Sequence, residues 1–272
     1  QKIDPSYIDQ HPVRIFDAAK SLIGLNLKSP SAPLFEYLDS QNVIEDLSTV
    51  TAENSIPPDT VSIYQLKDAI ENKDEKKCIE IISSIIRLSD GKHIVEFLLE
   101  LSLFKSGKSL VVIWAIYKTL EFIGYSSSKD VLNALIVSSQ ALIYDTAHKN
   151  SDNPNQCIDT HFNNNFFTLE ELELIGATYE ISNSNFIRKD SIDDSLRLFI
   201  SHLVLAFGSK TPDKNNNMIY ITHREELLAM LEEMDIEGKH VLASNALRAY
   251  MKNCKNPCRE KIAYYVSMIK EM

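Results

Sequence analysis

The 272-residue sequence contains little glycine and cysteine, and each shortage argues against a class of protein. Seven glycines allow few tight turns with positive φ, which argues against a protein built from β-hairpins. The four cysteines do not have the spacing of a small secreted domain held together by disulfides. The first ten residues also contain no apolar signal region. We therefore expect a soluble protein of a reducing compartment, the cytoplasm.

Runs of basic residues and long apolar runs are missing as well. The net charge of −10 opposes non-specific attraction to nucleic acids and to anionic lipids. The most apolar stretch, residues 110–124, is interrupted by Lys118 and Glu121 and is too short to span a membrane. We therefore expect that the protein has no nucleic-acid partner and no membrane-spanning segment.

Short motifs that would identify an activity are absent too. The sequence contains no phosphate-binding loop, no dinucleotide-binding fingerprint and no serine-hydrolase elbow. Cys254 and Cys258 are four residues apart, but the second close cysteine pair that a zinc site usually requires is missing. A function therefore has to be sought in the arrangement of less specific residues.

Apolar residues that recur every three or four positions dominate the chain, and no useful stretch alternates as a strand does. This pattern predicts an all-α protein with ten to twelve helices in a bundle or array. Thr168 with Glu171 has the spacing of a capping box, and Ser127 or Ser128 is suited to cap the following helix. The helices are expected at about residues 11–23, 33–47, 60–72, 78–88, 93–104, 109–123, 129–148, 168–183, 191–208, 219–234, 240–253 and 257–270.

One polar, asparagine-rich stretch at residues 149–166 divides the chain. Such a segment without apolar periodicity is typical of a linker or a surface loop. We expect an N-terminal helical half, residues 1–148, and a C-terminal half, residues 167–272, that together form one compact domain.

Three of the seven histidines stand at predicted helix starts. "DGKHIVEFLLELSLF" contains His93, "EGKHVLASNALRAY" contains His240, and "HPVRIFDAAKSLIGL" begins at His11. The positive end of the helix dipole keeps such an imidazole neutral, which suits metal binding. His202, on an apolar helix face, is expected to be buried. We predict that His11, His93, His202 and His240 converge on a metal ion, although each histidine can also be incidental.

Two glutamates follow His93 along its helix. Glu96 and Glu100 lie three and seven residues after it, on the same face. They could provide a fifth ligand or a catalytic acid and base. The alternative is a polar stripe that faces the solvent, as on any amphipathic helix.

The histidine segments resemble a known family. The pattern His-x-Val-x₄-Ala-Ala at 11–19 and His-Val-Leu-x₃-Ala-Leu at 240–247 is similar to helix starts of the questin oxidase-like family, and His93 matches only its first residues. The resemblance implies an all-α protein with several helix-borne histidines and a non-haem metal used to oxidise aromatic polyketides.

Two functions from different classes follow. The first is a non-haem metal-dependent oxidoreductase with iron, or manganese or zinc, that acts on a small organic molecule. The second is a non-catalytic scaffold or adaptor for a protein partner. The scaffold hypothesis expects a solvent-facing stripe at Glu96 and Glu100, and a groove or apolar patch for a partner helix.

Overall fold

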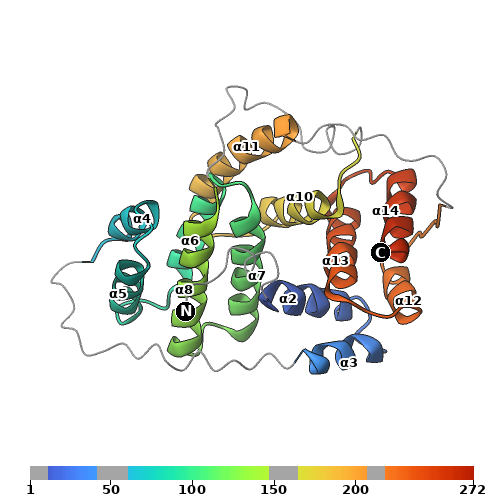
Figure 1. Ribbon diagram of the computed structural model, residues 1–272, viewed down its shortest axis with the longest axis horizontal. Coiled ribbons are helices and arrows are strands. Elements are labelled where there is room, and N and C mark those ends of the chain that lie inside the picture. Colours follow the sequence, from blue (N-terminus) through green and yellow to red (C-terminus); the bar gives the residue numbers. More distant parts are fainter. Residues whose placement is uncertain (1–11, 42–60, 147–164, 207–217) are drawn as a thin grey trace. The chain divides into compact units, whose positions relative to one another are not determined.

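The computed structural model describes residues 12–41, 61–146, 165–206 and 218–272, and these residues form twelve α-helices and no β-strand (Figure 1). The predicted all-α class and the predicted number of helices are thereby confirmed. None of the described helices combines the length and the apolar character that crossing a membrane requires.

The described residues fall into two compact units. Residues 61–146 and 186–192 make up the first unit, and all other described residues belong to the second. This division differs from the two expected halves, because residues 12–41 belong with the C-terminal segments and residues 186–192 belong with the first unit.

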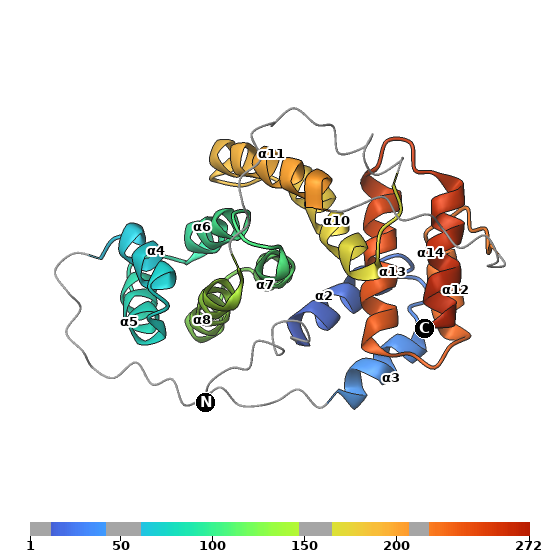
Figure 2. The same ribbon diagram turned by 45° about the horizontal axis from the view of Figure 1, so that its top comes forward.

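Helix α8 is the centre of the first unit and packs against each of the four helices that precede it in that unit. In Figure 2, α4 and α6 lie above α5 and α8. Helix α7 is buried on most sides, as its almost entirely apolar sequence indicates. The helices are α4 (Ile63–Glu71), α5 (Glu75–Ile86), α6 (Lys92–Ser102), α7 (Lys108–Ile123) and α8 (Ser128–Tyr144), with the start of α11 (Lys189–Ala206).

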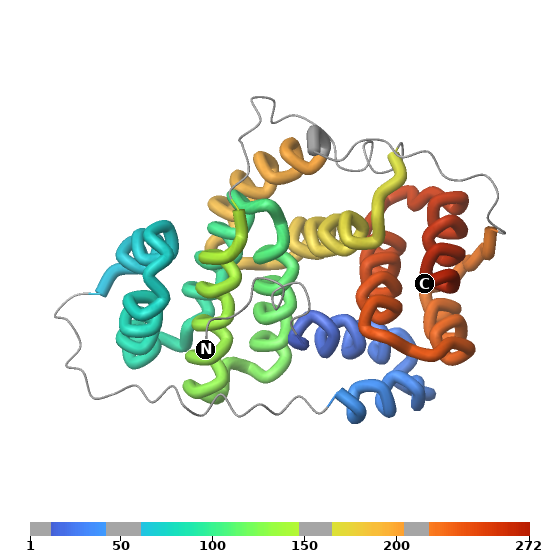
Figure 3. The backbone as a smooth tube through the Cα atoms, viewed as in Figure 1, coloured from blue at the N-terminus to red at the C-terminus, as the bar shows by residue number. Residues whose placement is uncertain are grey.

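Helix α13 is the corresponding centre of the second unit. It packs against α2, α10, α12 and α14, and Figure 3 shows it between α10 and α14. The helices are α2 (Pro12–Ile23), α3 (Ala32–Ser40), α10 (Leu169–Ser182), the remainder of α11, α12 (Glu226–Glu232), α13 (Gly238–Asn253) and α14 (Arg259–Glu271).

At the starts of α4, α5, α8 and α10, the N-cap side chain accepts a hydrogen bond from a free backbone N–H group. The Thr168 hydroxyl accepts from the Glu171 N–H at 3.2 Å, while the Glu171 carboxylate accepts from the Thr168 N–H at 2.6 Å. The predicted capping box is therefore confirmed, and so is Ser127 as the cap of α8. Ser62 caps α4.

The prediction of a helix over 219–234 is wrong at its start, because α12 covers only Glu226–Glu232. The backbone N–H groups of Thr222 and His223 donate to the Glu226 carboxylate at 2.9 and 2.7 Å. The Ile219 N–H donates to the Ser267 hydroxyl on α14 at 3.2 Å. Side chains thus accept hydrogen bonds from these backbone N–H groups, so the groups do not need a helix to be paired.

The two Gly-Lys-His segments begin helices, as predicted, but in different ways. Gly91 is the N-cap of α6 with φ +86°, and a Cβ atom there would lie 2.5 Å from a methyl group of Val131. Gly238 is instead the first residue of α13, whose N-cap is Glu237. His93 is therefore the second residue of its helix and His240 the third. The same three residues therefore occupy different positions at the starts of the two helices.

Helices α10 and α13 approach each other unusually closely at Gly176. A Cβ atom on Gly176 would lie 3.2 Å from the Cα atom of Ala246 and 3.2 Å from the Cβ atom of Ala249. Next to this crossing, Arg248 and Glu180 form an ion pair of 2.5 Å with little exposure. The small residues permit the close approach, and the ion pair adds charge-assisted hydrogen bonding to the crossing.

Gly176→Leu is expected to lower the free energy of unfolding by about 1–3 kcal/mol, because the neighbouring atoms include backbone that cannot move aside. Denaturant unfolding measures the loss. Gly24→Leu is the matched control, since Gly24 is exposed and a Cβ atom there would lie 3.4 Å from its nearest neighbour. Equal effects of the two substitutions would contradict the close crossing.

Candidate functional site

A groove of about 570 Å³ lies between α4 and α6 in the first unit. Its volume is within the range of ligand-binding sites. The groove is lined by residues of α4, of α6 with the turn that follows it, and of the start of α11: Ile63, Tyr64, Lys67, Ile70, Glu71, Phe97, Glu100, Leu101, Phe104, Lys105, Arg188 and Ser191.

One long wall of the groove is a face of α4, and the other is a face of α6 together with the turn that follows it. The α4 wall includes residues 63, 67, 70 and 71, and the other wall includes residues 97, 101, 104 and 105. Residues 63, 67, 70 and 71 lie in a row along one face of α4, and residues 97 and 101 lie on one face of α6, whereas residues 104 and 105 belong to the turn that follows α6. Two helices of a bundle present such rows to a third helix.

Aromatic rings stand at the edge of the groove. Tyr64 is 71% exposed and Phe104 is 36% exposed, although both are large and largely apolar. Phe97 and Ile70 are buried, so the groove has apolar walls below a partly exposed aromatic edge. Apolar and aromatic walls with a few polar groups are typical of binding sites.

The Glu96 carboxylate is fully buried beside this groove. It accepts hydrogen bonds from the backbone N–H groups of Ile187, at 3.1 Å, and Arg188, at 2.9 Å. These N–H groups precede α11 and have no acceptor within that helix. A negative charge at a helix N-terminus is also electrostatically favourable. Glu96 therefore fixes the point at which α11 begins.

Glu100 binds the side chains of the same segment. One carboxylate oxygen accepts from the Arg188 guanidinium at 2.6 and 3.1 Å, and the other accepts from the Ser191 hydroxyl at 2.8 Å. The guanidinium lies 5.3 Å from the centre of the Phe97 ring. Arg188 is thereby held in place as part of the groove wall.

These contacts correct one expectation. The interpretation of Glu96 and Glu100 as a solvent-facing stripe is wrong, because the start of α11 covers that face of α6: Glu96 is 0% exposed and the Glu100 side chain 16%. A catalytic role for the two glutamates stays a prediction. Sequence reasoning missed Arg188 and Ser191, which lie about ninety residues further along the chain and share no motif with the glutamates.

The predicted metal ligands are distributed over both units. His93 is half-buried in the first unit, with Nδ1 3.2 Å from the Ser89 hydroxyl, whereas His202 and His240 belong to the second. His11 lies outside the described residues. Across the described ranges, no three His, Cys, Asp or Glu side chains are placed to hold a metal ion. The four-histidine site, and with it iron, manganese or zinc, stays a prediction.

The expected burial of His202 is not observed, since the residue is only half-buried. The buried row of α11 runs through Ile192, Leu196, Phe199 and Leu203. His202 lies beside this row and not within it, so the apolar neighbours in sequence do not enclose its ring.

His240 is buried at 4% exposure, and its Nδ1 accepts a hydrogen bond from the Glu237 N–H at 3.0 Å. Burial and, secondarily, Lys239 lower the pKa of His240, while Glu237 and Asp235 act in the opposite direction. The expected neutral state agrees with this direction, although burial is the main cause. Because a backbone N–H can only donate, the ring proton lies on Nε2. Binding a metal through Nε2 would therefore disrupt this cap.

Lys261 is a second buried group that sequence reasoning missed. Its ammonium donates to the backbone carbonyl of Asn165 and lies 5.0 Å from the Phe166 ring centre and 5.6 Å from that of Phe167. Burial lowers the pKa of Lys261 to about 8. These contacts attach the segment before α10 to α14, which is a structural role.

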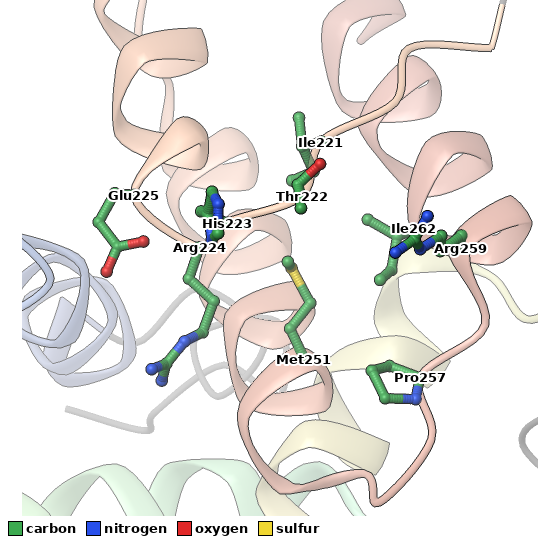
Figure 4. A pocket seen from close by; sticks show the side chains of 9 residues that line it. All are labelled: Ile221, Thr222, His223, Arg224, Glu225, Met251, Pro257, Arg259 and Ile262. Atoms are coloured by element: carbon green, nitrogen blue, oxygen red, sulfur yellow. The ribbon is translucent and has the colours of Figure 1, made fainter.

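A pocket of about 310 Å³ in the second unit has a polar, partly basic lining (Figure 4). Figure 4 shows Arg259 beside Ile262 and Arg224 directed away from Met251. His223 and Arg259 are exposed, so water competes with any ligand for their charges. This pocket is a weaker candidate than the groove. Its lining residues are Ile221, Thr222, His223, Arg224, Glu225, Met251, Pro257, Arg259 and Ile262.

Comparison with known protein families, with curated proteins and with solved structures gives no match for this chain. The resemblance to the questin oxidase-like family therefore stays a prediction. The geometry described above is the basis for a functional proposal.

Glu96→Ala is expected to lower the free energy of unfolding by about 3 kcal/mol, because two N–H groups lose their acceptor. Glu96→Gln retains one carbonyl acceptor and should lose less. Hydrogen exchange at Ile187 and Arg188 should accelerate in both variants. Glu80→Ala, at an exposed position on α5, is the control, and equal losses for Glu80→Ala and Glu96→Ala would contradict the capping role.

The lowered pKa of His240 makes stability depend on pH. The unfolded chain binds a proton near the ordinary pKa of 6.5, whereas the folded chain binds it only at lower pH. Stability is therefore fully present above pH 6.5 and falls as the pH drops towards the folded pKa. Denaturant unfolding at pH 7.5 and pH 5 should show a larger loss for the native chain than for His240→Gln, which keeps an acceptor. Equal losses would contradict the assignment.

Proposed function

We propose that the protein is a non-catalytic interaction module and that the groove of its first unit binds an amphipathic helix of a partner protein. The observation that carries this proposal is the pair of side-chain rows, one on α4 and one on α6 with the turn that follows it, which line the same open groove. A helix is the occupant whose own side-chain rows interdigitate with rows of this spacing.

The dimensions of the groove agree with this occupant. Residues 63–71 of α4 rise about 12 Å along the helix axis, which corresponds to roughly two turns of a bound helix. Two turns present apolar side chains at positions i, i+3, i+4 and i+7. Tyr64 and Phe104 at the edge provide aromatic contact area, the kind that often dominates the energy of protein interfaces.

The state of the carboxylates favours binding over chemistry at this site. All four oxygen atoms of Glu96 and Glu100 already accept hydrogen bonds from the start of α11. A general base must point at the proton that it removes, and these oxygen atoms point at the start of α11. At this site the glutamates therefore serve to build the wall of the groove.

The metal-dependent oxidoreductase is the rival hypothesis, and metal content distinguishes it from the proposal. A working site would retain close to one equivalent of iron, manganese or zinc in freshly purified protein without a histidine tag. That result, abolished by His240→Ala, would replace the proposal.

Selection from a displayed library of short helix-forming peptides tests the groove. Peptides enriched on the whole protein are expected to carry apolar residues at i, i+3 or i+4, and i+7. Tyr64→Asp and Phe104→Asp should weaken their binding at least about tenfold in a fluorescence-polarisation titration, because an unpaired carboxylate replaces apolar contact.

Leu88→Asp is the matched control, since Leu88 is 84% exposed in the same unit and does not line the groove. Its binding should equal that of the native chain. Peptides that bind Tyr64→Asp and Phe104→Asp as well as they bind the native protein would overturn the proposal.

A further inference from the structure

We infer that the partner helix is acidic beside its apolar face and that Lys105 is the residue which selects it. This inference rests on the proposed function of the groove. It concerns the charge of the occupant, which the apolar walls alone do not determine.

The charged side chains that line the groove are unequal in number. Three are cations (Lys67, Lys105 and Arg188) and two are carboxylates (Glu71 and Glu100). The chain as a whole has a net charge of −10. The lining of the groove thus contains one more cation than carboxylates, and an exposed cation attracts groups of negative charge.

The two carboxylates are also the less available charges. Glu100 is bound by the Arg188 guanidinium and by the Ser191 hydroxyl. The Glu71 carboxylate lies 3.8 Å from the Lys67 ammonium on the same helix. Each carboxylate of the groove thus already has a cationic neighbour within the protein.

Lys105 differs from these residues. Among the described residues, its ammonium has no hydrogen-bond or ion-pair partner. It lies on the α6 wall, three residues beyond the end of that helix and next to Phe104. An acidic side chain beside the apolar ridge of a bound helix would provide the missing partner.

The position of Lys67 extends the same argument to the opposite wall. Its side chain is 44% exposed, and its distance of 3.8 Å to Glu71 is that of a weak surface pair. A bound helix would therefore meet one ammonium on the α4 wall and one on the α6 wall, with apolar residues between them. The occupant that fits is an amphipathic helix with Asp or Glu on both sides of its apolar face.

Reversing the charge at one position tests this inference. The tightest selected peptide is compared with a version in which each Asp and Glu is replaced by Lys. Lys105→Glu should weaken binding of the acidic peptide about three- to tenfold, since an attraction between exposed charges becomes a repulsion. The same substitution should strengthen binding of the lysine version, and added salt should reduce both changes.

Lys76→Glu is the matched control, because Lys76 is an exposed lysine of α5 outside the groove and the substitution changes the net charge equally. It should leave both affinities within about twofold of the native values. Peptides that depend on Tyr64 and Phe104 but bind Lys105→Glu unchanged would overturn the inference and leave the proposed function intact.

Two further outcomes separate the possible occupants. Selected peptides that are basic, or that contain no charge beside the apolar face, would also overturn the acidic inference. A native chain that runs as a dimer and becomes a monomer on Tyr64→Asp would identify a second copy as the occupant, again against it. If binding of the selected peptides is unchanged by Tyr64→Asp and by Phe104→Asp, the proposed function itself is overturned.

Discussion

A carboxylate can be buried among apolar side chains only when donors surround it, and this requirement determines the geometry of the first unit. Glu96 meets it by accepting from two backbone N–H groups at the start of α11. The contact holds residues 187 and 188 against α6, which places Arg188 within reach of Glu100. The groove wall that includes Arg188 therefore depends on the two hydrogen bonds that the Glu96 carboxylate accepts. Glu96 thus accepts hydrogen bonds that place the start of α11, while its catalytic role stays a prediction.

The groove itself follows from how short helices are stabilised. Helices of nine to seventeen residues, such as α4 and α8, are marginal in isolation and depend on packing of an apolar face. Helix α4 obtains this packing from α5 and α8, and α6 obtains it from α7 and α8. Each still presents a second row of side chains to the groove. A bundle position that no described helix occupies is thus left between them, and a helix from another protein fits such a position by the same packing rules.

The Gly-Lys-His segments illustrate the limit of a short sequence resemblance. In one, glycine is a left-handed cap that lies against α8, and in the other it is an ordinary first helical residue. Consequently His93 contacts a serine hydroxyl, while His240 accepts a bond from its own helix cap. What the two segments share is that each begins a helix. Their similarity to helix starts of the questin oxidase-like family stays a prediction.

The sequence alone determined most of the helices, though not the start of α12, because their signals are local. Apolar spacing, the capping box at Thr168 and Glu171, and the cap at Ser127 all act within a few residues. Only the tertiary structure decided which helix faces are covered. Glu96 and Ile187 are 91 residues apart, and no local pattern encodes their contact. The same holds for the close crossing at Gly176 and for the groove, which is formed by side chains of three separate segments. The hydrogen bonds of a helix join residues that are close in the sequence, whereas the burial of a side chain depends on which distant segment packs against it.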